Sequence, residues 1–190
     1  DEVKGVVLSP HAVYPGAQIR ATRAVVSNLS CHPTFLDLIG EARLPDWVRR
    51  GVRDYRYDEG MMFTNYWVLD RPPRWEGYPE EVDTAFGFNF GLESVDDIRR
   101  LERNLAANEL PDPPIVAGLS VQGFSLADRT QAPEHRYTAM AWSCVPYELP
   151  AHGGPEKWDE IREAYGDKVD ALLREYNPAM MDSVVARYCN

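Results

Sequence analysis

The chain has 190 residues, of which 44% are hydrophobic and 26% charged, and its formal net charge is −10. This composition excludes a disordered chain and is typical of one folded domain. The negative charge argues against a nucleic-acid-binding surface, which requires clustered Lys and Arg, and no apolar run reaches the roughly 18 residues of a membrane-spanning helix.

Cysteine usage indicates a reducing compartment. Cys31, Cys144 and Cys189 lie far apart, and no Cys/His cluster has the spacing of metal ligands. The first ten residues, DEVKGVVLSP, show no basic segment before an apolar run, so we expect no signal peptide. A cytoplasmic protein without a metal site is the prediction.

Two strands are expected first, at residues 3–8 and 17–27, followed by two short helices. Pro33 is typical of a first helical turn, and Gly40 ends the apolar stripe of the first helix. The second helix is expected at residues 45–54. Because the sequence starts almost directly on a strand, we expect it to be a segment of a larger protein.

Residues 61–70 predict a strand whose period of two places Phe63 and Trp67 on one face and Tyr66 on the other. A second strand is expected at 84–90. Ser94 with Asp97 three residues later is typical of a helix N-terminus, and the stripe that follows comprises Val95, Ile98, Leu101 and Leu105.

Strands are expected at 115–121 and 137–145, the second with Met140 and Trp142 on one face. A long amphipathic helix follows up to Tyr176, and Asn177-Pro178 predicts the start of a final helix that ends near Cys189. Because strands and helices do not alternate regularly, the predicted class is α+β, a mixed, largely antiparallel sheet with helices packed on one side. We expect residues 1–190 to form a single substrate-binding domain.

Known catalytic and nucleotide-binding motifs are absent. None of the 13 glycines forms a GxGxxG loop, and there is no P-loop and no GxSxG elbow. Cys31 and His32 are adjacent, which favours a buried Cys beside a helix-start His over a nucleophile and its base. The sequence therefore assigns no catalytic residue.

Aromatic residues on the predicted strands allow two interpretations. They can form an ordinary core beneath the helices, or one sheet face can line an elongated cavity for a hydrophobic small molecule. The candidates for such a cavity are Phe63, Trp67, Phe86, Phe88, Phe90 and Trp142.

A basic stretch interrupts the otherwise acidic sequence. Arg49, Arg50 and Arg53 lie beside Trp47 on the second predicted helix. One interpretation is a solvated helix face, and the other is peripheral contact with anionic lipid.

Several segments, in order, resemble the phytoene desaturase and carotene ketolase family of FAD-dependent oxidoreductases. They are VKGVVLS with QIRATRAVVSNLSCHPTFLDLIGEARLP, then FTNYWVLDRPPRW, LADRTQAPEHRYTAMAWSCVPYEL and WDEIREAYGDKVDALLREYNPAMMDSVVAR. Two positions depart from the family pattern. Arg129 stands where proline is usual, and Pro133-Glu134-His135 lacks the usual glycine.

The resemblance implies that the chain is the central substrate-binding part of a flavoprotein, with residues 1–30 passing to or from the flavin domain. It implies FAD in the parent protein but none bound to this segment, and a long apolar, carotenoid-like substrate. The ketolase branch is somewhat closer than the desaturase branch. The alternatives are a self-contained domain that binds a small hydrophobic ligand and a domain for protein interaction.

Overall fold

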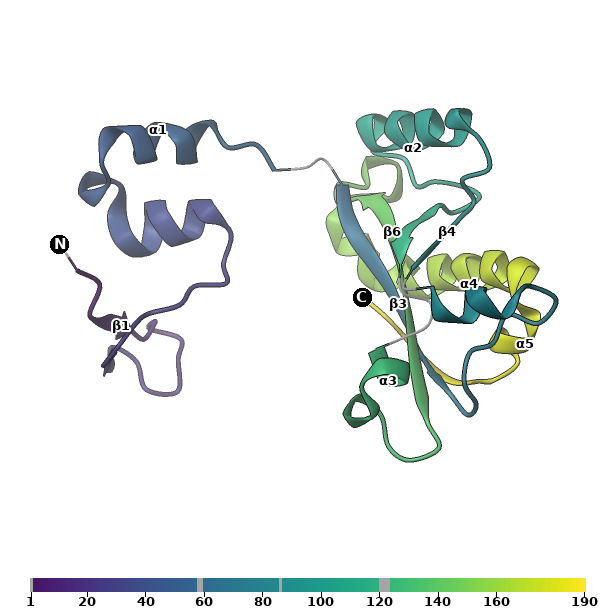
Figure 1. The fold of residues 1–190 in the computed structure, drawn as a ribbon. Coiled ribbons are helices and arrows are strands. Elements are labelled where there is room, and N and C mark those ends of the chain that lie inside the picture. The colour runs from purple at the N-terminus through teal and green to yellow at the C-terminus, as the bar shows by residue number, and fades with distance from the viewer. Residues whose placement is uncertain (1, 58–59, 86, 120–123) are drawn as a thin grey trace. The chain divides into compact units, whose positions relative to one another are not determined.

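The computed structural model describes residues 2–57, 60–85, 87–119 and 124–190. The chain forms two compact units, Asp1–Tyr57 and Asp58–Asn190, which are described separately (Figure 1). Whether both units act as one substrate-binding domain stays a prediction.

The first unit combines a small hairpin with short helices. Strands β1 (Gly5–Val7) and β2 (Gln18–Arg20) pair antiparallel, followed by the π-helix η1 (Pro33–Gly40), the 3-10 helix η2 (Glu41–Arg43) and α1 (Asp46–Asp54). Both predicted helices are therefore confirmed. The predicted strand at 17–27 was too long, because β1 offers only three residues with which β2 can pair.

The second unit is built on one five-stranded sheet with the order β4-β5-β6-β3-β7. Its strands are β3 (Gly60–Leu69), β4 (Phe88–Phe90), β5 (Val116–Leu119), β6 (Tyr137–Pro146) and β7 (Val184–Cys189). Every pairing found in the described part of the sheet is antiparallel.

Short and long helices connect these strands. The α-helices are α2 (Val95–Ala107), α3 (Phe124–Ala127), α4 (Trp158–Tyr176) and α5 (Pro178–Met181), and the 3-10 helices are η3 (Glu80–Thr84), η4 (Arg129–Gln131), η5 (Pro150–His152) and η6 (Pro155–Lys157). The long helix α4 packs along one side of the sheet (Figure 1). The predicted α+β class with a largely antiparallel sheet is confirmed.

Local signals located several of these elements correctly. Ser94 and Asp97 form the expected capping box at the start of α2, and the Asn177 side chain accepts a hydrogen bond from the Met180 backbone N–H at the start of α5. The hydrogen bonds from Ser94 lower the pKa of the Asp97 carboxyl below its ordinary value.

Two predicted elements were wrong, one at the C-terminal end of the sequence and one directly before β4. Residues 184–189 form a strand instead of a helix, because they pair along one edge of β3 from Asn65 to Leu69. Residues 80–84 form a 3-10 helix, so β4 covers only part of the predicted strand at 84–90. The α2 stripe is also less buried than expected, since Val95 and Ile98 are exposed.

The core lies between one face of the sheet and α4. Alternate residues of β3 and β6 are buried there, and α4 contributes Tyr165, Val169, Leu172 and Leu173. The Phe63 ring packs against Tyr165 at 5.1 Å and Trp158 at 5.6 Å between ring centroids. Such aromatic contacts stabilise a core beyond the area that they bury.

A polar network fixes α4 on the sheet. The Asp170 carboxylate accepts hydrogen bonds from Trp67 Nε1 at 2.9 Å, Asn65 Nδ2 at 3.1 Å and an Arg187 guanidinium nitrogen at 2.8 Å. Arg187 also forms ion pairs with Glu163 and Asp167 of α4. These donors compensate the cost of placing a carboxylate against the core.

Gly166 allows α4 to approach β7 closely. A Cβ at this position would lie 2.5 Å from Cys189 Sγ and 3.4 Å from Arg187 Cζ. We expect Gly166→Ala to lower the free energy of unfolding by about 1–3 kcal/mol, because overpacking outweighs the higher helix propensity of alanine. Urea unfolding followed by tryptophan fluorescence measures this change.

Two further variants complete this test. Gly166→Ala combined with Cys189→Ala should recover part of the loss, because the thiol is the nearest obstacle. Gly51→Ala in α1, where nothing lies within 4 Å of the added Cβ, should change stability by no more than about 1 kcal/mol. A Gly166→Ala variant as stable as the unchanged protein would contradict the close contact.

The thiol of Cys189 reports whether β7 is paired. Burial raises the pKa of this thiol to about 11, whereas Cys31 and Cys144 are only half-buried. At pH 8, a thiol reagent should therefore label Cys31 and Cys144 well before Cys189, and urea should abolish the difference. Because the folded pKa exceeds the unfolded one, the thiol stabilises the fold at neutral pH, and this contribution is lost as pH rises towards 11. Equal labelling rates of all three thiols in the folded protein would contradict the position of β7.

Candidate functional site

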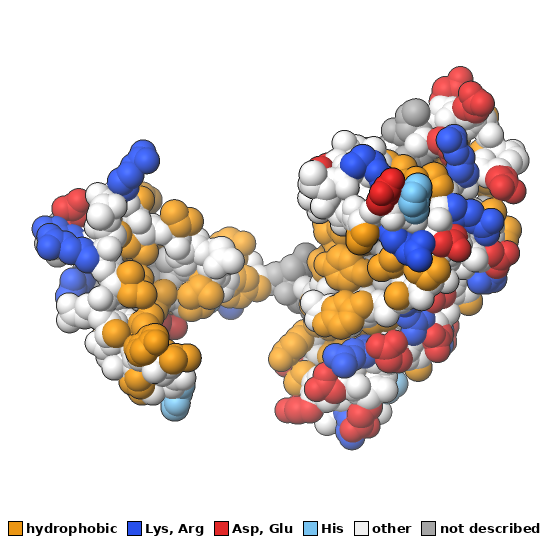
Figure 2. All heavy atoms as spheres, turned by 90° about the horizontal axis from the view of Figure 1, so that it is seen from below, with side chains coloured by type: hydrophobic (Ala, Val, Ile, Leu, Met, Phe, Trp, Pro, Cys, Tyr) orange, Lys and Arg blue, Asp and Glu red, His pale blue; other side chains and the backbone are white. Residues whose placement is uncertain are grey.

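The side of the sheet opposite α4 is half-exposed and carries no charge along its central strands. We call this surface the open face. It comprises Met62, Thr64, Tyr66 and Val68 of β3, Thr138, Met140, Trp142 and Cys144 of β6, and Ala186 and Tyr188 of β7, of which Thr64 is buried and the others are at least partly exposed. In the second unit, hydrophobic side chains gather in a band between charged ones (Figure 2).

Strand register explains why these side chains lie together. Tyr66 pairs with Met140 on one side and with Tyr188 on the other, and Thr64 pairs with Trp142. Residues directly opposite each other in a sheet project to the same face. The Tyr66 and Tyr188 rings therefore lie 6.3 Å apart between centroids, and both side chains are exposed.

Elements at the ends of β6 border the open face. At one end, the added Cβ of Gly60 would lie 2.8 Å from Cys144 Sγ and 3.3 Å from the Leu105 side chain of α2. At the other end, Ser125 of α3 accepts a hydrogen bond from the Thr138 backbone N–H. The middle of the face, around Tyr66 and Met140, stays partly exposed to solvent.

Monomeric proteins rarely leave a large contiguous apolar surface uncovered, and such surfaces usually contact another molecule. The open face offers aromatic, thioether and methyl groups, and its hydroxyls come from Thr and Tyr. It can therefore hold an apolar molecule by burying area from water, but it offers no charged group that could hold an anion or a cation.

The predicted cavity residues divide between the two faces of the sheet. Phe63 and Trp67 are 1% exposed, and both lie in the core with α4. Phe90 is also buried, and its ring stacks on Trp75 at 5.7 Å between centroids. Phe88 is half-buried, and its ring centroid lies 4.4 Å from that of Trp75. Trp142 lies on the open face, while Phe86 lies outside the described residues.

The structure thus brings Phe63, Trp67, Phe88 and Phe90 to the core side, whereas the strand register places Trp142, which is partly buried and also packs against the core, on the other face. That the six candidates line a cavity stays a prediction. Tyr66, Tyr188, Met62 and Met140 were not among those candidates, although they dominate the open face. The signal that could have found Tyr66 was its alternation with Phe63 and Trp67 along one strand.

The predicted membrane-contact residues all lie on α1 of the first unit. Trp47 is 73% exposed, whereas Arg49 forms an ion pair with Asp46 at 2.5 Å and Arg53 one with Glu41 at 2.6 Å. Arg50 is exposed, and it forms no ion pair with any of the described residues.

Cys31 and His32 serve a structural purpose in the same unit. His32 Nε2 lies 2.6 Å from the Val52 carbonyl oxygen, which can only accept, so this nitrogen carries the hydrogen and donates a hydrogen bond. The His32 backbone N–H donates to the Tyr57 hydroxyl, which also lies 3.5 Å from Cys31 Sγ. These contacts tie the start of η1 to the end of α1 and leave Nε2 unable to act as a base.

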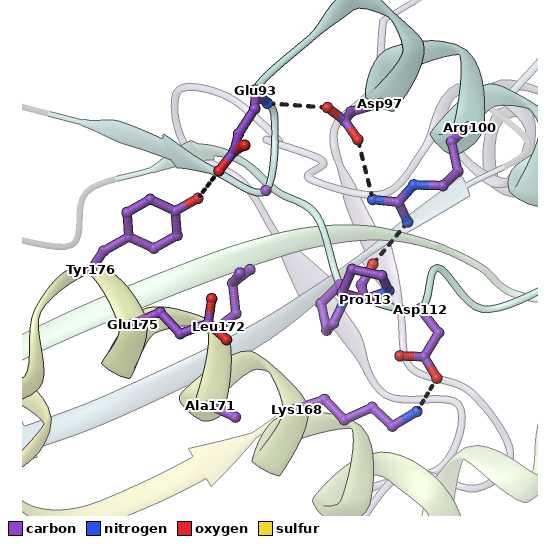
Figure 3. Close-up of a pocket in the computed structure, with 12 residues that line it drawn as sticks. Glu93, Asp97, Arg100, Asp112, Pro113, Lys168, Ala171, Leu172, Glu175 and Tyr176 are labelled. Carbon is purple, nitrogen blue, oxygen red and sulfur yellow. Dashed lines mark hydrogen bonds and ion pairs between the residues drawn. The ribbon is translucent and has the colours of Figure 1, made fainter.

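A separate groove of about 590 Å³ lies in the second unit between α2, the loop at residues 112–114 and α4 (Figure 3). Both of its cations and Glu93 have partners among the residues that line it. Lys168 Nζ contacts Asp112 at 2.5 Å, Arg100 reaches Asp97 and the Pro113 carbonyl, and the Tyr176 hydroxyl donates to Glu93.

The groove has an acidic balance. Glu93, Asp97, Asp112 and Glu175 line it together with only two cations, Arg100 and Lys168. Burial and the contact with Glu93 raise the pKa of the Tyr176 hydroxyl. A pyrophosphate is repelled by such a set of carboxylates, so the groove does not suit the phosphates of a dinucleotide.

In the described ranges, no cluster of three or more His, Cys, Asp or Glu side chains has the arrangement of a metal site. Nor does any helix there combine the length and apolarity needed to cross a bilayer.

Comparison with known proteins gives one distant relative. No family model matches the chain, and no solved structure matches it at a significant level. The chain is similar to a limonene dehydrogenase subunit of Castellaniella defragrans, at 24% identity over 179 residues. The alignment covers 90% of this chain and 32% of that protein, so the chain spans about a third of the length of this curated relative. This distant similarity relates the chain to an oxidoreductase subunit.

Proposed function

We propose that the chain is the substrate-binding region of an FAD-dependent oxidoreductase that acts on an apolar hydrocarbon of the terpenoid class, which includes carotenoids. The observation that carries this proposal is the similarity to the limonene dehydrogenase subunit along 90% of the chain. Limonene is a hydrocarbon made of isoprene units and has no hydrogen-bonding group.

The open face supports this substrate class. A hydrocarbon cannot be held by hydrogen bonds or ion pairs, so its binding depends on the apolar area removed from water. A surface with Met62, Tyr66, Met140, Trp142 and Tyr188 and without a charged side chain meets that requirement. The aromatic rings also favour unsaturated hydrocarbons, whose π systems pack against them.

The redox cofactor has to come from outside this chain. Dehydrogenation of a hydrocarbon needs an electron acceptor, and FAD supplies this chemistry when it is bound. This chain contains no glycine-rich dinucleotide loop, and the groove beside α4 is lined by four carboxylates. We therefore assign to this chain the binding and orientation of the substrate, and no step of electron transfer.

A ligand-binding or protein-interaction domain without catalysis is the second candidate. The exposed Tyr66 and Tyr188 favour it, since exposed aromatic side chains are also typical of protein interfaces. This candidate predicts that the protein encoded by the complete reading frame lacks flavin.

The first experiment tests the open face. Limonene and β-carotene, supplied in cyclodextrin, should quench or shift the tryptophan fluorescence of the protein. Met62→Lys should weaken binding at least about tenfold, because it places a charge on an apolar contact surface. Ile98→Lys on α2 is the matched control, since Ile98 is 48% exposed and Met62 is 50% exposed.

The control should bind as the unchanged protein does. If the unchanged protein binds neither hydrocarbon, or if the two lysine variants lose affinity equally, the open face is not the substrate surface. Circular dichroism spectra of all three proteins establish that they are folded.

The second experiment tests the cofactor. The complete reading frame that contains this sequence should yield a protein with flavin absorbance that dithionite bleaches, whereas the 190-residue chain alone should be colourless. Flavin that stays with the 190-residue chain through gel filtration contradicts the assignment of the cofactor to other residues. A colourless protein from the complete frame favours the second candidate.

A further inference from the structure

Residues 1–57 bury few large hydrophobic side chains of their own. In the described part of this unit, Val52 is the one hydrophobic residue in the buried core, while thirteen large hydrophobic residues are exposed. They come from separate elements, such as Val7 and Ile19 of the hairpin, Leu38 of η1 and Trp47 of α1. Exposure on this scale is unusual for a unit that is surrounded by water alone.

The two units differ in charge as well. Residues 1–57 contain eight Lys and Arg and six Asp and Glu, a net charge of +2. Residues 58–190 contain the remaining twelve basic and 24 acidic residues, a net charge of −12. The first unit therefore suits an anionic surface, whereas the second is repelled by one.

Helix α1 presents both properties side by side. Val52 is buried and Val48 is half-buried, whereas Trp47 and Arg50 are exposed. Residues three apart are neighbours on a helix surface, so Trp47 and Arg50 project from the same side of α1. Arg49 and Arg53 are held by Asp46 and Glu41, but the described residues provide no such carboxylate contact for Arg50.

We propose that α1 docks residues 1–57 on an anionic lipid surface, with Trp47 at the level of the head groups and Arg50 against their phosphates. Indole rings prefer the membrane–water interface, and each basic side chain near an anionic membrane adds to the attraction. A fluid lipid layer also accepts apolar side chains that stand apart, whereas a protein partner needs one contiguous, complementary surface. The inference does not depend on the proposed function, because it concerns α1 alone.

Vesicle co-sedimentation of the 190-residue chain tests this docking. The protein should sediment with vesicles of equal parts phosphatidylcholine and phosphatidylglycerol and stay in solution with pure phosphatidylcholine. High salt should release it, because screening weakens attraction between charges outside the lipid. Binding should also shift the Trp47 emission to shorter wavelength, measured as the difference between the unchanged protein and Trp47→Phe.

Variants separate α1 from the rest of the chain. Arg50→Glu should weaken partitioning roughly tenfold or more, and Trp47→Ala should weaken it severalfold. Arg103→Glu reverses one exposed charge on α2 in the second unit and should leave binding unchanged. Because Trp47 and Arg50 are both exposed, we expect the variants to fold. Circular dichroism spectra check this.

Three outcomes would overturn the proposal. They are no binding to anionic vesicles, equal binding to both vesicle compositions, and a loss with Arg103→Glu as large as with Arg50→Glu. None of these outcomes affects the hydrocarbon-binding test, which compares Met62→Lys with Ile98→Lys. The two proposals can therefore fail separately.

Discussion

The second unit depends on the hydrogen bonds that the Asp170 carboxylate accepts. This carboxylate joins α4 to the sheet by accepting hydrogen bonds from Asn65 and Trp67 of β3 and from Arg187 of β7. Burial alone lowers the pKa of Arg187, but the carboxylates of Glu163, Asp167 and Asp170 outweigh this effect and keep the guanidinium charged. A half-buried carboxylate left without these donors destabilises the fold, so the network specifies where α4 sits.

The position of α4 determines which sheet face is available for binding. Gly166 brings α4 close to Cys189, and the neighbouring aromatic rings of Phe63 and Tyr165 fill the space beneath it. The alternate residues of β3 and β6 are then left on the open face. Its lack of charge suits the apolar ligand that we propose, and a hydrocarbon bound there would lie near Trp142 instead of near Trp67.

The chain combines two units with different surface chemistry. The second has a well-packed core, an acidic exterior and an apolar open face. The first has a small hairpin, short helices tied together through His32 and Tyr57, and a basic, partly apolar exterior. Hydrocarbons concentrate in membranes because water excludes them. Lipid contact by the first unit would therefore suit an enzyme that draws its substrate from a bilayer.

Local sequence signals determined many elements of this protein. The alternation in β3, the Ser94–Asp97 capping box and the apolar stripe of α4 each arise from residues close together in the sequence, so they were predictable. The strand at 184–189 was not, because its conformation depends on the distant edge of β3, which outweighs local helix propensity. The same limit applies to the candidate site. A period of two assigned Trp67 and Tyr66 to opposite faces, but only the docking of α4 through Gly166 and Asp170 decided which face is buried and which is open.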